Sequence, residues 1–156
     1  MHPSTKLSEN FRLSEFIKSG TATRLGIDNS PSNDIITRLY LMANMIAQPI
    51  RDHYKRSTTI NSGYRCLELN RALKSSDTSQ HVTGSALDIE VSGIDNYELA
   101  NWIKENLDFD QLILEFYDGT PASGWVHVSL SESGTNRGEC LTINKGSIKR
   151  GLVKNG

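Results

Sequence analysis

Long apolar runs are missing from this sequence of 156 residues, and no hydrophobic stretch approaches the roughly 20 residues that span a bilayer. Residues 1–10 lack the apolar segment of a secretory signal, so we expect synthesis in the cytoplasm and no membrane partner. Blocks of like charge are also missing and the formal net charge is −1, which argues against a nucleic-acid partner. The two cysteines, Cys66 and Cys140, have no metal-type spacing around them, which favours reduced thiols over a disulfide.

The composition is that of an ordinary globular protein. Hydrophobic residues make up 37% of the chain and charged residues 22%. The length suits one domain with a sizeable core. We therefore expect a monomer with a single domain over residues 1–156, in which residues 1–56 form a helical N-terminal part and residues 57–145 form the core.

Helical patterns dominate the first third of the chain. Residues 13–18 are expected to form a short helix with Ser14 as its N-cap. Ser32 is expected to cap the longest helix, residues 33–54, which Pro49 should kink or divide. Apolar residues at spacings of three and four give this helix one buried stripe: Ile35, Leu39, Met42, Met45, Ile46 and Ile50.

The rest of the chain reads mostly as strands. Alternating and β-branched segments predict strands at 58–61, 86–91, 111–117, 125–130 and 139–144, with helices at 67–73 and 96–106. Residues 74–83 are expected to be irregular and the residues at the end of the chain frayed. This order predicts an α+β fold with a mostly antiparallel sheet and helices packed on one face.

Side-chain alternation separates two faces of the three central strands. One face is apolar: Leu87, Ile89, Val91, Leu112, Leu114, Phe116, Val126, Val128 and Leu130. The other face carries a polar set: Asp88, Glu90, Glu115, Trp125 and His127. His81 can fold back over that face through Gly84. An antiparallel sheet often leaves one face solvated, so the pattern fits an ordinary polar surface as well as a functional site.

Three residues of this polar set have the chemistry of a metal site. Two histidines and one aspartate are the ligands of a catalytic zinc ion that keeps its fourth position open. If the strands are neighbours, His81, Asp88 and His127 can meet on the face opposite the helices. One Zn²⁺ on that face is therefore one of the two interpretations that the pattern leaves open.

The spacing of these residues resembles that of a known family. The pattern Ser79-x-His81-x-x-Gly84-x-Ala86-x-Asp88 with a later Trp125-x-His127 is similar to that of the zinc D-Ala-D-Ala carboxypeptidases. That family, peptidase family M15 with a hedgehog-like metallopeptidase fold, includes phage cell-wall endopeptidases and vancomycin-resistance dipeptidases. The upstream Ser62-Gly63-Tyr64-Arg65 matches a third family element, and Asn70 stands where these proteins often carry asparagine.

The resemblance implies roles for individual residues. His81, Asp88 and His127 would bind the zinc, and Arg65 would stabilise the oxyanion formed from the scissile carbonyl. The substrate contacts would come from Ser79, Tyr64 and Trp125. Ser79 would also order its own loop through backbone hydrogen bonds.

One position departs from the family pattern. Many members carry the catalytic acid three positions before the last histidine, where this chain has Gly124. Glu115 is the first candidate for the missing base, because it shares the polar face of a strand expected to pair with that of His127. Glu90 is the second candidate and Asp118, in a turn, the third.

The implied function is that of a zinc metallopeptidase, a hydrolase that cuts peptide bonds in bacterial peptidoglycan stem peptides. The resemblance leaves open a carboxypeptidase and an endopeptidase type of cleavage. The expected lack of a signal suits an endolysin of a bacteriophage or prophage, which degrades the cell wall after release. Gly124 keeps an alternative open: a non-catalytic zinc-containing module that binds the wall or belongs to a virion.

Overall fold

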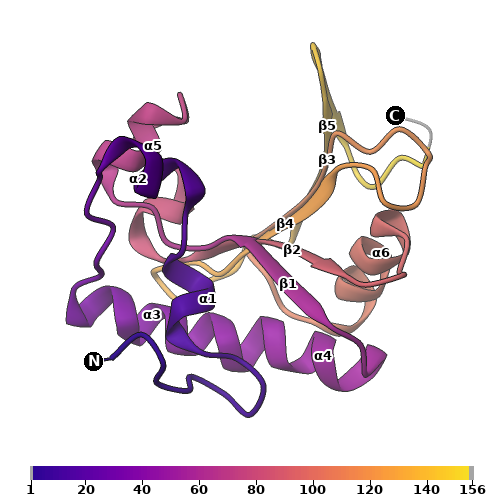
Figure 1. Ribbon diagram of the computed structural model, residues 1–156. Coiled ribbons are helices and arrows are strands. Elements are labelled where there is room, and N and C mark those ends of the chain that lie inside the picture. Colours follow the sequence, from indigo (N-terminus) through magenta and orange to yellow (C-terminus); the bar gives the residue numbers. More distant parts are fainter. Residues whose placement is uncertain (1, 155–156) are drawn as a thin grey trace.

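A mixed sheet of six strands organises the chain in the computed structural model, which describes residues 2–154. The strand order is β1-β2-β4-β3-β5-β6, and every neighbouring pair is antiparallel except the parallel pair β3 and β5. The expected α+β fold with a mostly antiparallel sheet is therefore confirmed. Figure 1 shows the sheet curving upward from β1 to β5, with α3 and α4 below it and α5 above.

The helices and strands have the following bounds. The helical segments are α1 Leu13–Ile17, α2 Gly20–Leu25, α3 Asn33–Met42, the π-helix η1 Ala43–Ala47, α4 Gln48–Tyr54, α5 Leu67–Ala72, the 3₁₀-helix η2 Gln80–Thr83 and α6 Asn96–Asn106. The strands are β1 Thr58–Ser62, β2 Ala86–Val91, β3 Gln111–Glu115, β4 Trp125–Ser129, β5 Glu139–Asn144 and β6 Ser147–Arg150. Among the described residues no helix has the length and apolarity to cross a membrane.

The two predicted helix caps have different outcomes. The Ser32 hydroxyl accepts a hydrogen bond from the backbone N–H of Ile35 at 3.3 Å, so the cap of α3 is confirmed. The Ser14 cap is wrong, because α1 begins after Arg12. There the Glu15 carboxylate accepts a hydrogen bond from the Arg12 backbone N–H at 2.7 Å, so this N–H at the start of the helix has a partner.

Pro49 divides the long helical stretch as predicted. Because proline has no N–H to continue the hydrogen-bond ladder, the chain widens into η1 and resumes as α4 with Pro49 in its first turn. The wider turns of η1 rotate Met45 outward, where it is 49% exposed, so its place in the buried stripe is wrong. Ile36 is buried on the core side instead.

The core lies between the apolar face of the sheet and the helices. Helices α3, η1, α4 and α6 contribute buried side chains that join those of the central strands in one cluster. Of the residues predicted on the apolar face of the strands, Phe116 is the one that lies outside this core: it has a φ of 55° and is 46% exposed. This left-handed residue ends the alternation of β3, so Tyr117 takes the inward position that strand alternation predicts for Phe116.

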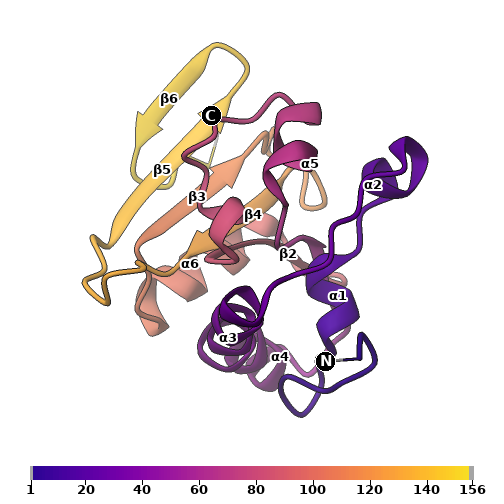
Figure 2. The same ribbon diagram turned by 90° about the vertical axis from the view of Figure 1, so that its left-hand side faces the viewer.

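The C-terminal part adds two strands to the edge of the sheet. β5 has the predicted bounds, but the expectation of a frayed end is wrong for residues 147–150, which form β6. The Thr142 hydroxyl donates to the Gly151 carbonyl at 2.8 Å and accepts from the Val153 N–H at 2.9 Å. The folded sheet therefore extends beyond residue 145, and Figure 2 shows β5 and β6 at the edge far from α1 and α3.

Candidate metal centre

His81, Asp88 and His127 meet on the face of the sheet opposite α3 and α4. One ligand atom from each lies within 4.8 Å of the other two, and all three residues are buried. Asp88 and His127 are direct partners across β2 and β4, and η2 carries His81 over them. Asp88 Oδ1 lies 3.3 Å from His81 Nε2 and 3.2 Å from His127 Nδ1. The predicted convergence of the three residues is present.

The backbone around His81 determines how its ring faces Asp88. The ring Nδ1 lies 2.7 Å from the carbonyl oxygen of Gly63, which can only accept, so Nδ1 carries the proton and Nε2 presents a lone pair. Gly84, with a φ of 73°, ends η2 and turns the chain into β2. The Ser79 hydroxyl caps η2 by accepting from the His81 N–H at 3.3 Å.

The protonation of the cluster suits a metal cation. Burial lowers the pKa of His81 and so favours its neutral, metal-binding form. Burial alone would raise the pKa of Asp88, but contacts with the two histidines outweigh it and lower that pKa. A neutral Nε2 lone pair 3.3 Å from an ionised carboxylate oxygen gives two electron-pair donors facing each other, an arrangement that a shared metal cation would stabilise. The donor set, with nitrogen and oxygen ligands facing a cleft, therefore fits Zn²⁺.

Arg65 is fixed beside this cluster. Its guanidinium lies 3.4 Å from Asp88 Oδ2, donates to Ser62 Oγ at 2.9 Å and lies 3.4 Å from Asn70 Oδ1. Its backbone N–H donates to the His81 carbonyl at 3.0 Å. Since the side chain is only 15% exposed, these contacts hold a permanent positive charge at the edge of the candidate site.

Glu115 is the predicted base that the structure brings to the same cleft. A cleft of about 540 Å³ is lined by Glu115 together with Arg65 and the three members of the cluster. Trp125, opposite Glu115 across β3 and β4, donates its indole N–H to Glu115 Oε2 at 2.6 Å. Burial, and next the charge of Asp88, raise the pKa of Glu115, which makes this carboxylate a stronger proton acceptor than an exposed one.

The other two candidates lie elsewhere. Glu90 accepts hydrogen bonds from Asn61 at 2.7 Å and Asn96 at 3.0 Å, and it lines a separate pocket. Asp118 accepts from the Thr120 N–H at 2.9 Å within the exposed turn before β4. Of the three candidates for the base, Glu115 is the one that faces the cluster.

The predicted substrate-contacting residues are divided between two pockets. Ser79 and Trp125 line the cleft of the cluster. Tyr64 does not: it lines an adjacent pocket of about 260 Å³ with Lys18, Ser19 and Leu73. Its backbone N–H donates to the Phe16 carbonyl at 2.7 Å. The two pockets adjoin, because Arg65 lines both. Tyr64 is therefore not among the residues that line the cleft, and its predicted contact with the substrate stays a prediction.

The backbone around position 124 explains why this chain has glycine where the family pattern has an acid. It has a φ of 63°, and a Cβ added there would overlap the carbonyl oxygen of Glu115. No side chain fits at this point without moving the backbone of β3. The acid expected three positions before His127 is therefore excluded by the close approach of the two strands.

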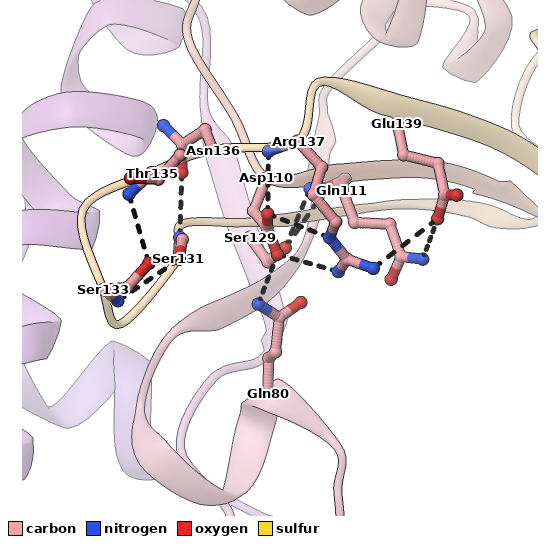
Figure 3. Close-up of polar contacts among 10 residues, drawn as sticks. All are labelled: Gln80, Asp110, Gln111, Ser129, Ser131, Ser133, Thr135, Asn136, Arg137 and Glu139. Carbon is pink, nitrogen blue, oxygen red and sulfur yellow. Dashed lines mark hydrogen bonds and ion pairs between the residues drawn. The ribbon is translucent and has the colours of Figure 1, made fainter.

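The far end of the cleft contains residues that no sequence pattern predicts. Gln80, Gln111 and Arg137 line it there, and Figure 3 shows buried Asp110 joining Gln80 to Arg137. Arg137 follows β4 in a connection without regular structure, and no pattern in the sequence places it beside the cluster.

An α+β fold with a buried His-Asp-His cluster lining a cleft defines a candidate metalloprotein. A comparison with protein families identifies the family: residues 9–129 match the Peptidase M15 model, so the chain belongs to the Peptidase M15 family. Membership implies a metallopeptidase. A comparison with curated proteins gives no match.

Proposed function

We propose that this protein is a zinc peptidase that hydrolyses peptide bonds in the stem peptides of bacterial peptidoglycan. The observation that carries the proposal is the convergence of His81, Asp88 and His127 in one cleft with Glu115 and Arg65. Family membership supports peptidase chemistry, and the resemblance to wall-degrading members supports the substrate. An endolysin of a phage or prophage, made in the cytoplasm and acting as a monomer after release, is the biological role that we infer.

The two histidines and the aspartate would hold one zinc ion. Zinc held there would supply Lewis-acid chemistry, because it lowers the pKa of water and polarises a carbonyl group. His81 is already oriented for this role by the Gly63 carbonyl, which fixes its tautomer.

The chain's own groups perform the proton transfers and stabilise the charge. Glu115 takes a proton from the attacking water and passes it to the leaving amine. Trp125 holds one oxygen of that carboxylate at 2.6 Å, which leaves the other free to act. The Arg65 guanidinium stabilises the negative charge that develops on the oxygen of the scissile carbonyl. Ser79 and Trp125 form walls of the cleft that position the peptide.

Mass spectrometry of purified peptidoglycan after incubation with the protein tests the proposal. We expect new amino and carboxyl termini within the stem peptides, and their masses identify the bond. Unchanged fragments would refute the peptidase function, and adsorption of the protein without cleavage would favour a wall-binding module.

A further inference from the structure

Arg137 stands at one end of the cleft, outside the residues that match the family model. Its side chain is 57% exposed, yet it is held in one orientation (Figure 3). The Arg137 Nε donates to Asp110 Oδ1 at 3.1 Å and Nη2 donates to Asp110 Oδ2 at 2.8 Å. The Arg137 backbone N–H donates to Oδ1 as well, at 2.9 Å. An exposed arginine anchored through three bonds is a preorganised group.

Asp110 orients the whole of this end of the cleft. It is 4% exposed and also accepts from the Gln80 amide at 2.9 Å. Gln80 precedes His81 in η2, so a single buried carboxylate joins the segment that carries the metal cluster to the segment that carries Arg137. Asp110 lies behind the guanidinium and does not line the cleft, whereas Gln80, Gln111 and Arg137 do.

Part of the guanidinium is left free. Asp110 uses Nε and one N–H of Nη2, out of the five N–H groups that an arginine offers. Within residues 2–154, Nη1 forms a long ion pair with Glu139, whose Oε1 is 4.0 Å away and accepts from Gln111 at 2.7 Å. Nη1 donates no hydrogen bond among the described residues, so its donors can bind a ligand in competition with the Glu139 charge.

The strand register places Gln111 and Glu115 on opposite sides of the His-Asp-His cluster, and Arg137 lies on the Gln111 side, because its Nη1 is 4.0 Å from Glu139, the partner of Gln111. His127 pairs with Ile113, Trp125 pairs with Glu115, and Gln111 pairs with Glu139 on β5. Gln111 and Glu115 thus lie two residues from the His127 row in opposite directions, about 7 Å each along the strand. A peptide lying along β3 meets the base on one side of the scissile bond and the arginine on the other.

We propose that Arg137 binds a carboxylate of the peptide substrate, on the side of the metal cluster away from Glu115. A guanidinium held from behind, with free N–H donors beside two amides, matches the two oxygens of a carboxylate. The carboxylate is either the C-terminal one, as in carboxypeptidase cleavage, or one on an internal residue, as in endopeptidase cleavage. The inference depends on the proposed peptidase function and specifies its substrate.

The test uses one stem peptide in three forms: with only the terminal carboxylate free, with only internal carboxylates free, and with all of them amidated. For the zinc-loaded wild type we expect kcat/KM to be about 10- to 100-fold higher for one singly free form than for the fully amidated peptide, mainly through KM. The preferred form identifies the source of the carboxylate. Arg137→Gln should lose this preference and cleave all three forms like the amidated peptide.

Three further variants separate recognition from a structural role. Arg71→Gln removes an arginine that also makes two bonds to an aspartate, Asp77, but outside the cleft, so it should keep the preference. Arg137→Lys, which retains the charge, should keep part of the preference even if Arg137→Gln folds poorly. Glu139→Gln removes a competing carboxylate and should strengthen the preference.

Each alternative result has a definite meaning. Equal loss of activity on all three peptides in Arg137→Gln, or a preference that survives it, would overturn the inference while the peptidase function stands. If the wild type cleaves none of the peptides, the proposed function fails, and calorimetric binding of the three peptides decides the inference. Tighter binding of one free acid that Arg137→Gln abolishes supports it, and equal binding of all three refutes it.

Discussion

Replacing Gly124 with alanine tests how tightly β3 and β4 approach each other beside the candidate base. Gly124 has a φ of 63°, and a Cβ would overlap the Glu115 carbonyl oxygen and lie 2.7 Å from the Phe116 carbonyl carbon. These atoms belong to the backbone, so no side-chain rotation can relieve the contact. The backbone that carries Glu115 must therefore move.

Two costs add up in this variant. An L-residue in the left-handed region costs about 1–2 kcal/mol relative to glycine. Forcing a methyl group into a closely packed position costs a further ~1–3 kcal/mol. We expect Gly124→Ala to lower the free energy of unfolding by about 2–5 kcal/mol, a large part of the stability of a typical domain.

Denaturant unfolding of Gly124→Ala and Gly26→Ala gives two losses of unfolding free energy, and the difference between them is the steric cost at Gly124. Gly26 has a φ of 68°, but a Cβ added there would meet no atom within 4 Å, so its replacement should cost only the first of the two amounts. Equal losses of stability in the two variants would refute the close approach that we infer. Activity should also fall further in Gly124→Ala, because the displaced backbone carries Glu115.

Three other predictions concern the cluster and its surroundings. Asp88→Ala should lose the single zinc ion, and stoichiometric zinc in the purified variant would contradict the assigned ligands. Glu115→Gln should keep zinc and lower kcat by about 10²–10⁴, whereas Glu90→Gln should keep most of the activity; the reverse order in the cleavage assay would move the base to Glu90. Hydrogen bonds from Arg137 lower the pKa of Asp110 to about 2, so its contribution to stability is present above about pH 4 and is lost as the pH falls toward 2. Asp110→Asn should cost about 1–2 kcal/mol at pH 7, because the exposed partner screens the pair, and this difference from wild type should disappear near pH 2 in unfolding titrations.

Local patterns were sufficient to predict most of the elements of the fold. β2 and α6 have the predicted bounds, because strand alternation and an amphipathic stripe are each encoded within one segment. Met45 and Phe116 were misplaced, since a π-turn and a left-handed residue each shift which side of an element a residue faces. The parallel pairing of β5 with β3 joins segments far apart in the chain, and no local pattern specifies it.

The candidate site also contains residues that local patterns predict and residues that they do not. His81, Asp88 and His127 could be identified because their residue types and the faces of their strands agree with one chemistry. Arg137 could not, because its position depends on a connection without regular structure and on an aspartate buried behind it. Tyr64 lines the adjacent pocket for a related reason, since a neighbouring sequence position does not determine which of two adjoining pockets a residue lines.

Gly124 and Glu115 together explain how the proposed base can come from another strand. An acid at position 124 would need a Cβ where the Glu115 carbonyl oxygen lies, so the two arrangements exclude each other in this backbone. The same approach of the strands brings Trp125 opposite Glu115, where its indole N–H holds the carboxylate toward the cluster. Introducing glutamate at position 124 would therefore displace the carboxylate already present rather than add a second base. Gly124 therefore has two effects: it removes the acid that the family pattern expects, and it allows Glu115 to face the cleft in that acid's place.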